Sequence, residues 1–203
     1  MIKDQNYLAK IAEKALDKAK NLGSTDASIL VANSVSENIN IRNRKLDGSE
    51  RSENLSINLT TYLGKKKSSI SSSNLRENNI NELISRCFEA TKITPEDELN
   101  SLPDKELHFT GKKNLELFDD THLDNKSKID FIKEAEDAAF SNKKIVNTNG
   151  SGFSESKSNF ILANSNGFCD GYMSSQFTAF CEVVSKRICP YEPKMFFGNL
   201  SWI

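Results

Sequence analysis

Over about the first ninety residues, the spacing of apolar residues changes from the period of a helix to that of a strand and back again. Apolar residues recur at three- and four-residue steps over residues 8–22, which predicts an amphipathic helix with one stripe toward a core. Gly23 is predicted to end this helix, because glycine accepts the positive φ that follows a last helical turn. The period then becomes two, and we predict strands at residues 27–32, around 39–41, at 55–63 and at 68–73.

A second amphipathic helix is predicted between Asn74, a candidate N-cap, and Pro95, which disfavours helical backbone in the residue before it. Its apolar face includes Cys87, which we interpret as a small core residue. The following stretch to residue 124 is charged and has little periodicity. We interpret it as a connecting excursion with one short strand near residues 115–118.

The last third repeats the change from helix to strand. A helix is predicted over residues 127–141, with Ser127 as its N-cap. Strands are predicted at 145–153, 156–164 and 172–185. Asn166-Gly167 stands between the last two, and this pair favours a type I′ hairpin turn, in which φ is positive twice.

These elements together predict an α+β fold in which antiparallel sheets pack with amphipathic helices. Alternating apolar and polar residues along a strand leave one sheet face buried and the other exposed to solvent, as is typical of antiparallel sheets. The order of helices and strands also indicates an internal duplication of one helix–strands unit. We divide the chain into a first helix–sheet–helix unit (1–94), a connecting excursion (95–126), a second helix–sheet unit (127–187) and an atypical tail (188–203).

Charge and composition exclude several classes of protein. The chain has 27 basic and 28 acidic side chains, and this balance argues against a nucleic-acid partner. No apolar signal core precedes the first helix, and no run approaches the roughly 18 apolar residues of a membrane span. We therefore expect a cytoplasmic protein with no membrane partner. The four cysteines form no Cys-x-x-Cys pair, so no disulfide framework is expected.

A search for catalytic chemistry predicts no catalytic residue and no metal ligand. A zinc site needs at least three ligands, but His108 and His122 show no paired spacing and neither is followed by Glu. We interpret both as loop histidines. The serines of residues 68–73 lack the Gly-x-Ser-x-Gly elbow that exposes a nucleophile. Gly150-Ser151-Gly152 is followed by a predicted strand, and so lacks the helix N-terminus of a phosphate loop.

One segment carries a family resemblance. Residues 162–168 read Leu-Ala-Asn-Ser-Asn-Gly-Phe, and Gly-Tyr-Met-Ser-Ser follows at 171–175. This pattern resembles the N-terminal domain of the PmbA/TldE and TldD proteins. The stretches Ile41-Arg42-Asn43, Tyr62-Leu63-Gly64 and Ile93-Thr94-Pro95 agree with that family in order and kind. The resemblance covers about residues 5–187.

The resemblance implies a cytoplasmic metallopeptidase system, also described as a modulator of DNA gyrase, that works as a heterodimer on unfolded peptides. In that family the TldD partner supplies a His-Glu-x-x-x-His zinc site, which the PmbA/TldE partner lacks. The motif is missing here, although it would fall beyond the region covered. We expect the non-catalytic N-terminal part of a PmbA/TldE-type subunit, inactive alone and without a cofactor, with zinc only in a TldD-like partner.

The turn residues Ser165, Asn166, Gly167 and Phe168 are the candidate border of a peptide groove. Polar strands can hold an extended peptide by β-augmentation, which recognises backbone and tolerates many sequences. Turn chemistry explains the first three residues equally well, and Phe168 also fits a core position. Two other functions stay open: a peptide-binding or assembly module of the gyrase-modulator type without a hydrolytic role, and a non-functional gene remnant.

The tail departs from the family, whose members continue into a β-rich C-terminal domain. Two prolines, Phe196-Phe197 and Trp202 crowd into residues 188–203. Our hypothesis is that this tail is frame-shifted or prematurely terminated coding sequence and that the family's C-terminal domain is absent. A divergent but genuine ending is the alternative.

Overall fold

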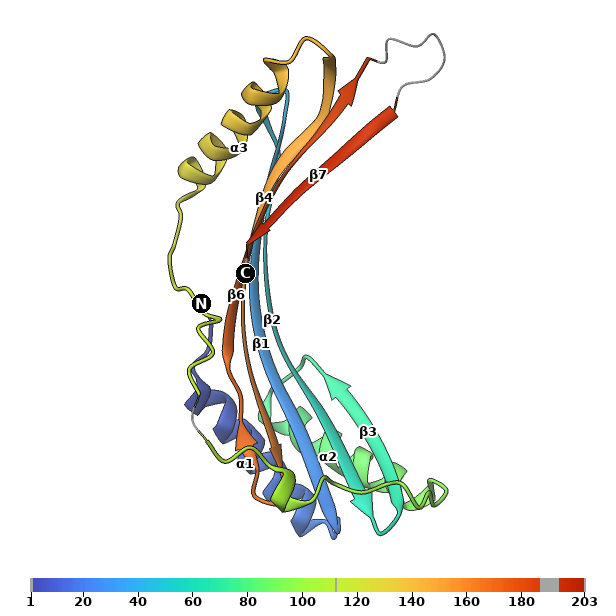
Figure 1. Ribbon diagram of the computed structural model, residues 1–203. Helices are drawn as coiled ribbons and strands as arrows, with labels where there is room; N and C mark the ends of the chain where they lie inside the picture. Colours follow the sequence, from blue (N-terminus) through green and yellow to red (C-terminus); the bar gives the residue numbers. More distant parts are fainter. Residues whose placement is uncertain (1, 112, 187–193, 203) are drawn as a thin grey trace. The chain divides into compact units, whose positions relative to one another are not determined.

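The computed structural model describes residues 2–111, 113–186 and 194–202, and these parts contain three α-helices, one 3₁₀ turn and seven strands (Figure 1). The helices are α1 (Gln5–Asn21), α2 (Glu77–Ile93) and α3 (Asn125–Phe140), and the 3₁₀ turn is η1 (Lys105–Leu107). The strands are β1 (Asp26–Arg42), β2 (Lys45–Leu63), β3 (Lys66–Ser72), β4 (Ile145–Asn164), β5 (Cys169–Asp170), β6 (Met173–Ser185) and β7 (Lys194–Trp202).

The described strands form one sheet with the order β3-β2-β1-β4-β6-β7, and β5 pairs with β4. β2 and β3 pair antiparallel from Ile57 opposite Ser72 to Leu63 opposite Lys66. β4 with β5 and β6 with β7 are antiparallel as well. The predicted α+β class with an antiparallel sheet is confirmed.

The chain forms two compact units, and each draws on three separate stretches of sequence. The first comprises Met1–Ser34, Glu53–Glu116 and Ser158–Met173, and the second comprises Val35–Ser52, Leu117–Lys157 and Ser174–Ile203. The predicted division at residues 94–95, 126–127 and 187–188 stays a prediction. Residues 188–193 and 203 of the predicted tail lie outside the described residues, as does residue 187 before it.

The core of the first unit lies between α1, α2 and one face of the sheet. Alternate residues of the strands point into it, as the period of two predicted. Cys87 of α2 is 1% exposed, which confirms its interpretation as a core residue. The buried members are Leu8, Ala12, Ala15 and Ala19 of α1, Ala27, Ile29 and Val31 of β1, Ile57 and Leu59 of β2, Ile84 and Cys87 of α2, and Ile161 and Ala163 of β4.

The core of the second unit joins α3 to the sheet through Ile132, which packs with Ile39, Ile41 and Phe153. A buried ion-pair cluster lies beside it. The Lys128 Nζ atom of α3 is 2.7 Å from a carboxylate oxygen of Glu37 and 2.7 Å from one of Glu155. The Lys128 side chain is only 1% exposed, so its charge is compensated inside the unit and not by water.

Helix ends follow local chemistry. Gly23 has φ +102°, and Ser24 N donates to Ala19 O, so α1 ends at the predicted glycine in a Schellman arrangement. The N-cap of α3 is Asp124, whose carboxylate accepts from Ser127 N. The predicted cap at Ser127 was therefore wrong by one turn, because the Asp124 carboxylate caps the helix three residues earlier and Ser127 itself lies in the first turn.

Three strand predictions need correction. β1 and β4 are each one long strand where the alternation predicted two, because backbone pairing continues through polar residues that interrupt the hydrophobic pattern. Residues 115–118 form no strand in the described chain.

The turn prediction needs correction as well. The turn with two positive φ values is Asn43–Arg44 (50° and 61°), between β1 and β2, whereas in Asn166-Gly167 the positive φ belongs to Gly167 alone.

Candidate functional site

The predicted site residues lie in the turn that follows β4, and the side chain of Asn164 organises this turn. Asn164 Oδ1 accepts from the backbone N of Asn166 (3.0 Å) and of Phe168 (3.2 Å). The Asn164 backbone N donates to Phe168 O (2.9 Å), and Gly167 N donates to Asn164 O (3.2 Å). Gly167 has φ +93°, a conformation that glycine adopts without strain. The site prediction missed Asn164, although an Asx turn is a recognisable local signal.

Ser165 and Asn166 fasten this turn to neighbouring segments. Ser165 N donates to Ala27 O, Ser165 Oγ accepts from Ala27 N (3.1 Å), and the same hydroxyl donates to Asp26 (2.9 Å). Asn166 Nδ2 donates to Pro103 O (3.2 Å). These contacts give both side chains a structural role at the start of β1 and in the excursion before η1.

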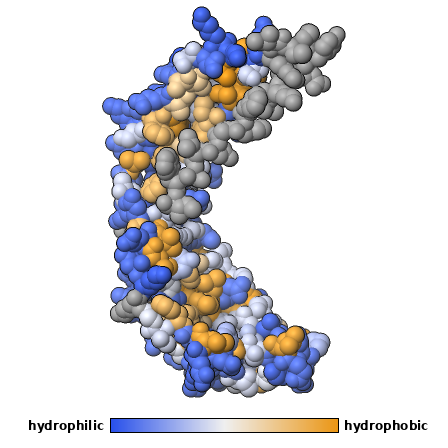
Figure 2. All heavy atoms as spheres, viewed as in Figure 1, coloured by the Kyte–Doolittle hydropathy of each residue, from blue (hydrophilic) through white to orange (hydrophobic). Residues whose placement is uncertain are grey.

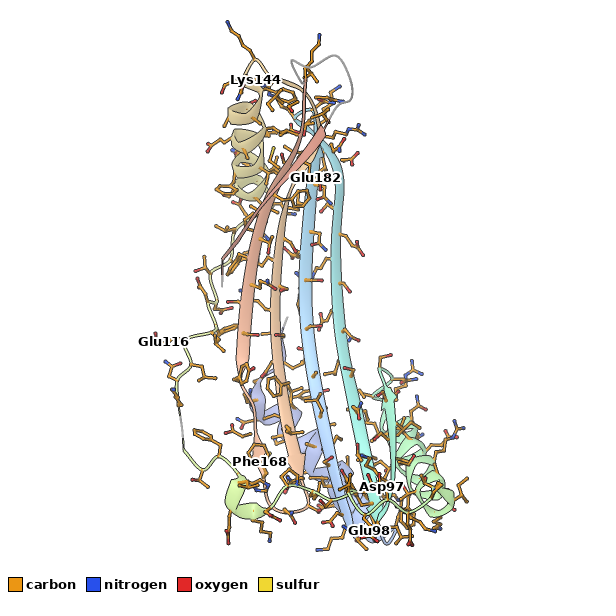
Figure 3. All side chains as sticks on the ribbon, turned by 45° about the vertical axis from the view of Figure 1, so that its right-hand side comes forward. Asp97, Glu98, Glu116, Lys144, Phe168 and Glu182 are labelled. Carbon is orange, nitrogen blue, oxygen red and sulfur yellow. The ribbon has the colours of Figure 1, made fainter. Side chains whose placement is uncertain are left out.

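Phe168 differs from the other three because it lies against the chain that follows η1 (Figure 3). Its ring centroid is 5.1 Å from that of His108. The same histidine lies with Nε2 3.4 Å from Asn164 Nδ2. The turn and the His108 segment are therefore held together by an aromatic contact and by side-chain amide chemistry.

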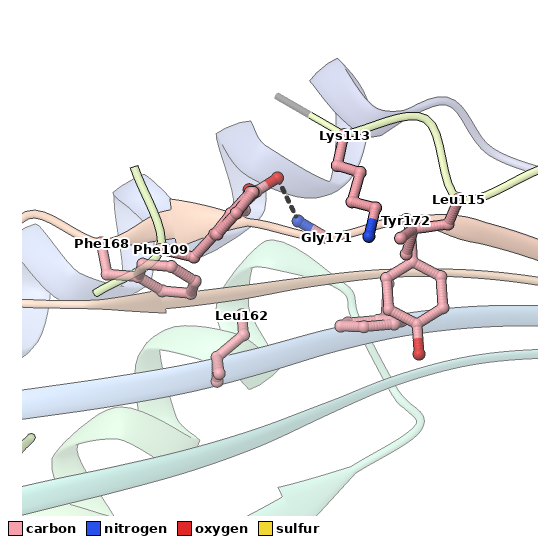
Figure 4. A pocket seen from close by; sticks show the side chains of 9 residues that line it. Phe109, Lys113, Leu115, Leu162, Phe168, Gly171 and Tyr172 are labelled. Carbon is pink, nitrogen blue, oxygen red and sulfur yellow. Dashed lines mark hydrogen bonds between the residues drawn. The ribbon is translucent and has the colours of Figure 1, made fainter. Parts of the chain in front are cut away.

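A pocket of about 340 Å³ opens beside Phe168 (Figure 4). It is lined by Phe109, Lys113, Leu115, Phe160, Leu162, Phe168, Asp170, Gly171 and Tyr172. Four of these are large apolar residues that are more than 40% exposed: Phe109, Leu115, Leu162 and Tyr172. On the face of the molecule shown in Figure 2, apolar residues occur as separate patches between hydrophilic ones.

The pocket is shaped by the chain between β5 and β6, which runs antiparallel beside β4 at very close range. A Cβ at Gly171 would lie 1.8 Å from Phe160 O, so only glycine fits there. This approach brings the rings of Phe160 and Tyr172 into a T-shaped contact with centroids 4.6 Å apart. Of the pocket residues, the site prediction included Phe168 alone. The others come from three separated segments, which no local pattern connects.

A second concavity, of about 460 Å³, lies between α1 and the same turn. Ser165, Gly167 and Phe168 line it, together with Cys169. Desolvation raises the pKa of the Cys169 thiol, and the carboxylates of Asp170 and Glu13 raise it further. The thiol is therefore protonated at neutral pH, which is the less nucleophilic form.

The described residues contain no group of three His, Cys, Asp or Glu side chains arranged to hold a metal ion. A zinc site needs at least three such ligands, and the ring of His108 is engaged by Asn164 and Phe168 instead. The donor set in this part of the chain does not fit zinc. None of the helices that the structure describes combines the length and the apolar character needed to cross a membrane.

Two family models match the chain. One, for "PmbA/TldA metallopeptidase domain 1", matches residues 27–91, and the other, for "PmbA/TldA metallopeptidase central domain", matches residues 118–195. A metalloprotease PmbA homolog from Haemophilus influenzae is 25% identical over 181 residues, which is 89% of this chain and 40% of the relative. The metalloprotease PmbA of Escherichia coli O157:H7 is 27% identical over 171 residues, 82% of this chain and 38% of the relative. The chain thus spans well under half the length of these relatives.

Solved structures share the fold. A candidate modulator of DNA gyrase from Bacteroides thetaiotaomicron superposes with a TM-score of 0.82 at 23% identity, covering 100% of this chain and 45% of its own. TldE from Thermococcus kodakarensis superposes with a TM-score of 0.72 at 15% identity, covering 94% of this chain and 42% of its own. At these identities the likeness concerns the fold alone.

Proposed function

The chain belongs to the PmbA/TldA metallopeptidase family, and on that premise we propose that it is the non-catalytic N-terminal part of a PmbA/TldE-type subunit. In this proposal it works in the cytoplasm with a TldD-like subunit, and the pair degrades or processes unfolded peptides. The observation that carries the proposal is the ordered match to domain 1 and to the central domain of the family. The zinc is proposed to lie in the TldD-like partner, as the resemblance to the family implies.

The role proposed for this chain is to hold an extended peptide for the partner. In the first unit, α1 and α2 cover one face of the sheet, and the opposite face carries side chains with hydrogen-bonding groups. Asn58 Nδ2 donates to Ser71 Oγ (3.0 Å), and the hydroxyls of Thr60 and Ser69 are 2.8 Å apart. Short polar side chains of this kind accept many peptide sequences, and immobilising a substrate lowers the entropic part of the reaction barrier.

The test is a reconstitution of hydrolysis. This chain and a TldD-like subunit encoded in the same genome are purified separately, and cleavage of an unfolded, fluorescence-quenched peptide is measured for each alone and for the mixture. We expect no cleavage by this chain, slow cleavage by the partner and clearly faster cleavage by the mixture, with all cleavage lost after metal chelation. If the partner cleaves the peptide equally fast with and without this chain, the proposal is contradicted.

A second candidate is an assembly module of the gyrase-modulator type, which the description of the Bacteroides structure favours. The two functions separate in one further measurement. Supercoiling by DNA gyrase is followed with and without this chain. The peptidase-subunit proposal expects no change in the supercoiling rate, whereas the assembly-module alternative requires one.

A further inference from the structure

We infer that the pocket beside Phe168 binds one large apolar side chain of an extended peptide, while Lys113 and Asp170 at its rim hold the adjoining peptide group. This inference rests on the proposed function, since it names the substrate feature that such a subunit recognises. The pocket lies wholly within the first compact unit. It therefore requires only residues of this chain.

The size and the walls of the pocket suit one side chain. Its volume of about 340 Å³ is near the lower end for ligand sites, which span roughly 300–1,000 Å³. Phe160, Phe168 and Tyr172 present aromatic surfaces on which another ring can stack in an offset or edge-to-face geometry. Leu162 adds an aliphatic wall from β4 and is 42% exposed. Exposed apolar residues that gather in a hollow are typical of an interaction site.

The rim supplies one donor and one acceptor. Lys113 lines the pocket, and its ammonium points toward the Gly171–Tyr172 stretch in Figure 4. No ion pair within the described residues engages Lys113. Asp170 accepts from Gly171 N (2.7 Å) through one carboxylate oxygen, and a carboxylate has a second oxygen with further acceptor capacity.

These two charges select among apolar ligands. A peptide group offers one C=O acceptor and one N–H donor, which match the lysine ammonium and the aspartate carboxylate. A hydrocarbon tail has neither group, and a phosphate would be repelled by Asp170. The combination of an apolar hollow with a balanced polar rim therefore points to a peptide with a large apolar residue.

Three aromatic residues of the walls are positioned by contacts within the chain. The close approach of Gly171 to β4 sets the pair Phe160–Tyr172, and Asn164 sets the backbone of Phe168. Phe109 and Leu115 form the remaining wall from the segment after η1, and they are 57% and 43% exposed. A preformed hollow loses little conformational entropy on binding, which favours affinity for a short ligand.

The experiment uses the full chain and two acetylated and amidated peptides of Ser, Thr and Gly residues, one with a single central Phe and one with Ser at that position. Binding is measured by isothermal titration. We expect the Phe peptide to bind about tenfold more tightly, because burying one aromatic side chain is worth at least that ratio. Leu162→Thr should abolish the difference, and Lys113→Met should weaken the Phe peptide by roughly threefold.

Leu99→Thr is the matched control, because Leu99 is 88% exposed and lies outside the pocket. It should bind both peptides as the unmodified chain does. Lys113 lies in an exposed segment, so Lys113→Met keeps the test valid if Leu162→Thr disturbs β4. Circular dichroism of each variant shows which case applies.

Three results would overturn the inference. The two peptides could bind equally well, Leu162→Thr and Lys113→Met could both leave the affinity for the Phe peptide unchanged, or neither peptide could bind. None of these results alters the reconstituted hydrolysis described above, so failure of the pocket and failure of the proposed function are separately visible. Conversely, if the chain prefers the Phe peptide but does not speed up hydrolysis by the partner, the pocket inference stands and the proposed peptidase role is contradicted.

Discussion

Asn164 Oδ1 lies 3.2 Å from the backbone N of Phe168 and accepts its hydrogen bond. The Asn164 side chain is buried at the end of β4, with the residue 9% exposed, and the same oxygen also accepts from Asn166 N. One buried amide therefore determines where the Phe168 ring enters the pocket. The conformation of the turn and the shape of the candidate site depend on the same atom.

Replacing Asn164 by Ala should lower the free energy of unfolding by about 2 kcal/mol, because it leaves two backbone donors of a partly buried turn without their acceptor. Urea denaturation measures this loss. Asn142→Ala is the control, since Asn142 Oδ1 also accepts from a backbone N two residues later (3.0 Å, at Lys144) but lies on the surface. The control should change stability by less than about 0.5 kcal/mol. Equal losses in the two variants would contradict the role given to Asn164.

Gly171→Ala should destabilise the first unit by about 3 kcal/mol, because the added Cβ would meet Phe160 O at 1.8 Å and the chain between β5 and β6 would have to move away from β4. Thermal unfolding measures the effect. Gly48→Ala is the matched change, since nothing lies within 4 Å of a Cβ at that position, and it should be nearly neutral. Tolerance of alanine at residue 171 would mean that the approach of this chain to β4 is looser than the structure indicates.

Features set by neighbours in the sequence could be predicted. The amphipathic helices, the end of α1 at Gly23 and the core position of Cys87 follow from period and local chemistry, and the structure contains them. The two positive φ values at Asn43–Arg44 could not be predicted this way. The carboxylate of Glu136 accepts from both backbone N atoms there (3.2 and 2.7 Å), so a contact with α3 overrides the preference of a type I′ turn for glycine.

The pocket could not be predicted either, because it too depends on contacts between distant parts of the chain. Phe168 was singled out from its turn motif, but the residues it meets come from the segment after η1, from β4 and from the chain after β5. Hydrophobic alternation identified Leu162 only as a strand residue. Which face of a strand stays open depends on where the helices pack, and that information lies in long-range contacts.

Lys128→Met should lower the free energy of unfolding by about 3 kcal/mol, because it leaves Glu155, which is 8% exposed, with a weaker partner. Lys157 Nζ is 3.6 Å from Glu155 and compensates in part. Lys126→Met, two residues earlier on the exposed side of α3, is the control and should be close to neutral. Chemical denaturation of both variants compares them directly. A loss that is no larger at residue 128 would show that the ion-pair cluster contributes little.

The ion-pair cluster should also give stability a dependence on pH at both ends of the range. For Glu37, the hydrogen bond from Lys128 holds the pKa below its usual 4.5, outweighing the effect of burial, and Arg51 adds to this. For Lys128, burial is the largest single influence and lowers the pKa, but the contacts of its ammonium with the Glu155 and Glu37 carboxylates together raise it above its usual 10.5. A carboxylate whose pKa is lowered in the folded state stabilises that state at pH values above its unfolded-state pKa. This stabilisation is lost as the pH falls through the folded-state pKa. A lysine whose pKa is raised in the folded state stabilises that state at pH values below its unfolded-state pKa. This stabilisation is lost as the pH rises through the folded-state pKa.

The difference in unfolding free energy between the unmodified chain and Lys128→Met isolates this cluster from other titrating groups. Asp124, whose pKa is lowered by the hydrogen bond from Ser127, contributes equally to both proteins and cancels. We expect the difference to be largest and constant between about pH 5 and about pH 10 and to shrink on either side. Urea midpoints measured across that range in buffers of constant ionic strength provide the curve. A difference that stays the same at acid and alkaline pH would mean that packing around the lysine stem, and not its charge, holds α3 to the sheet.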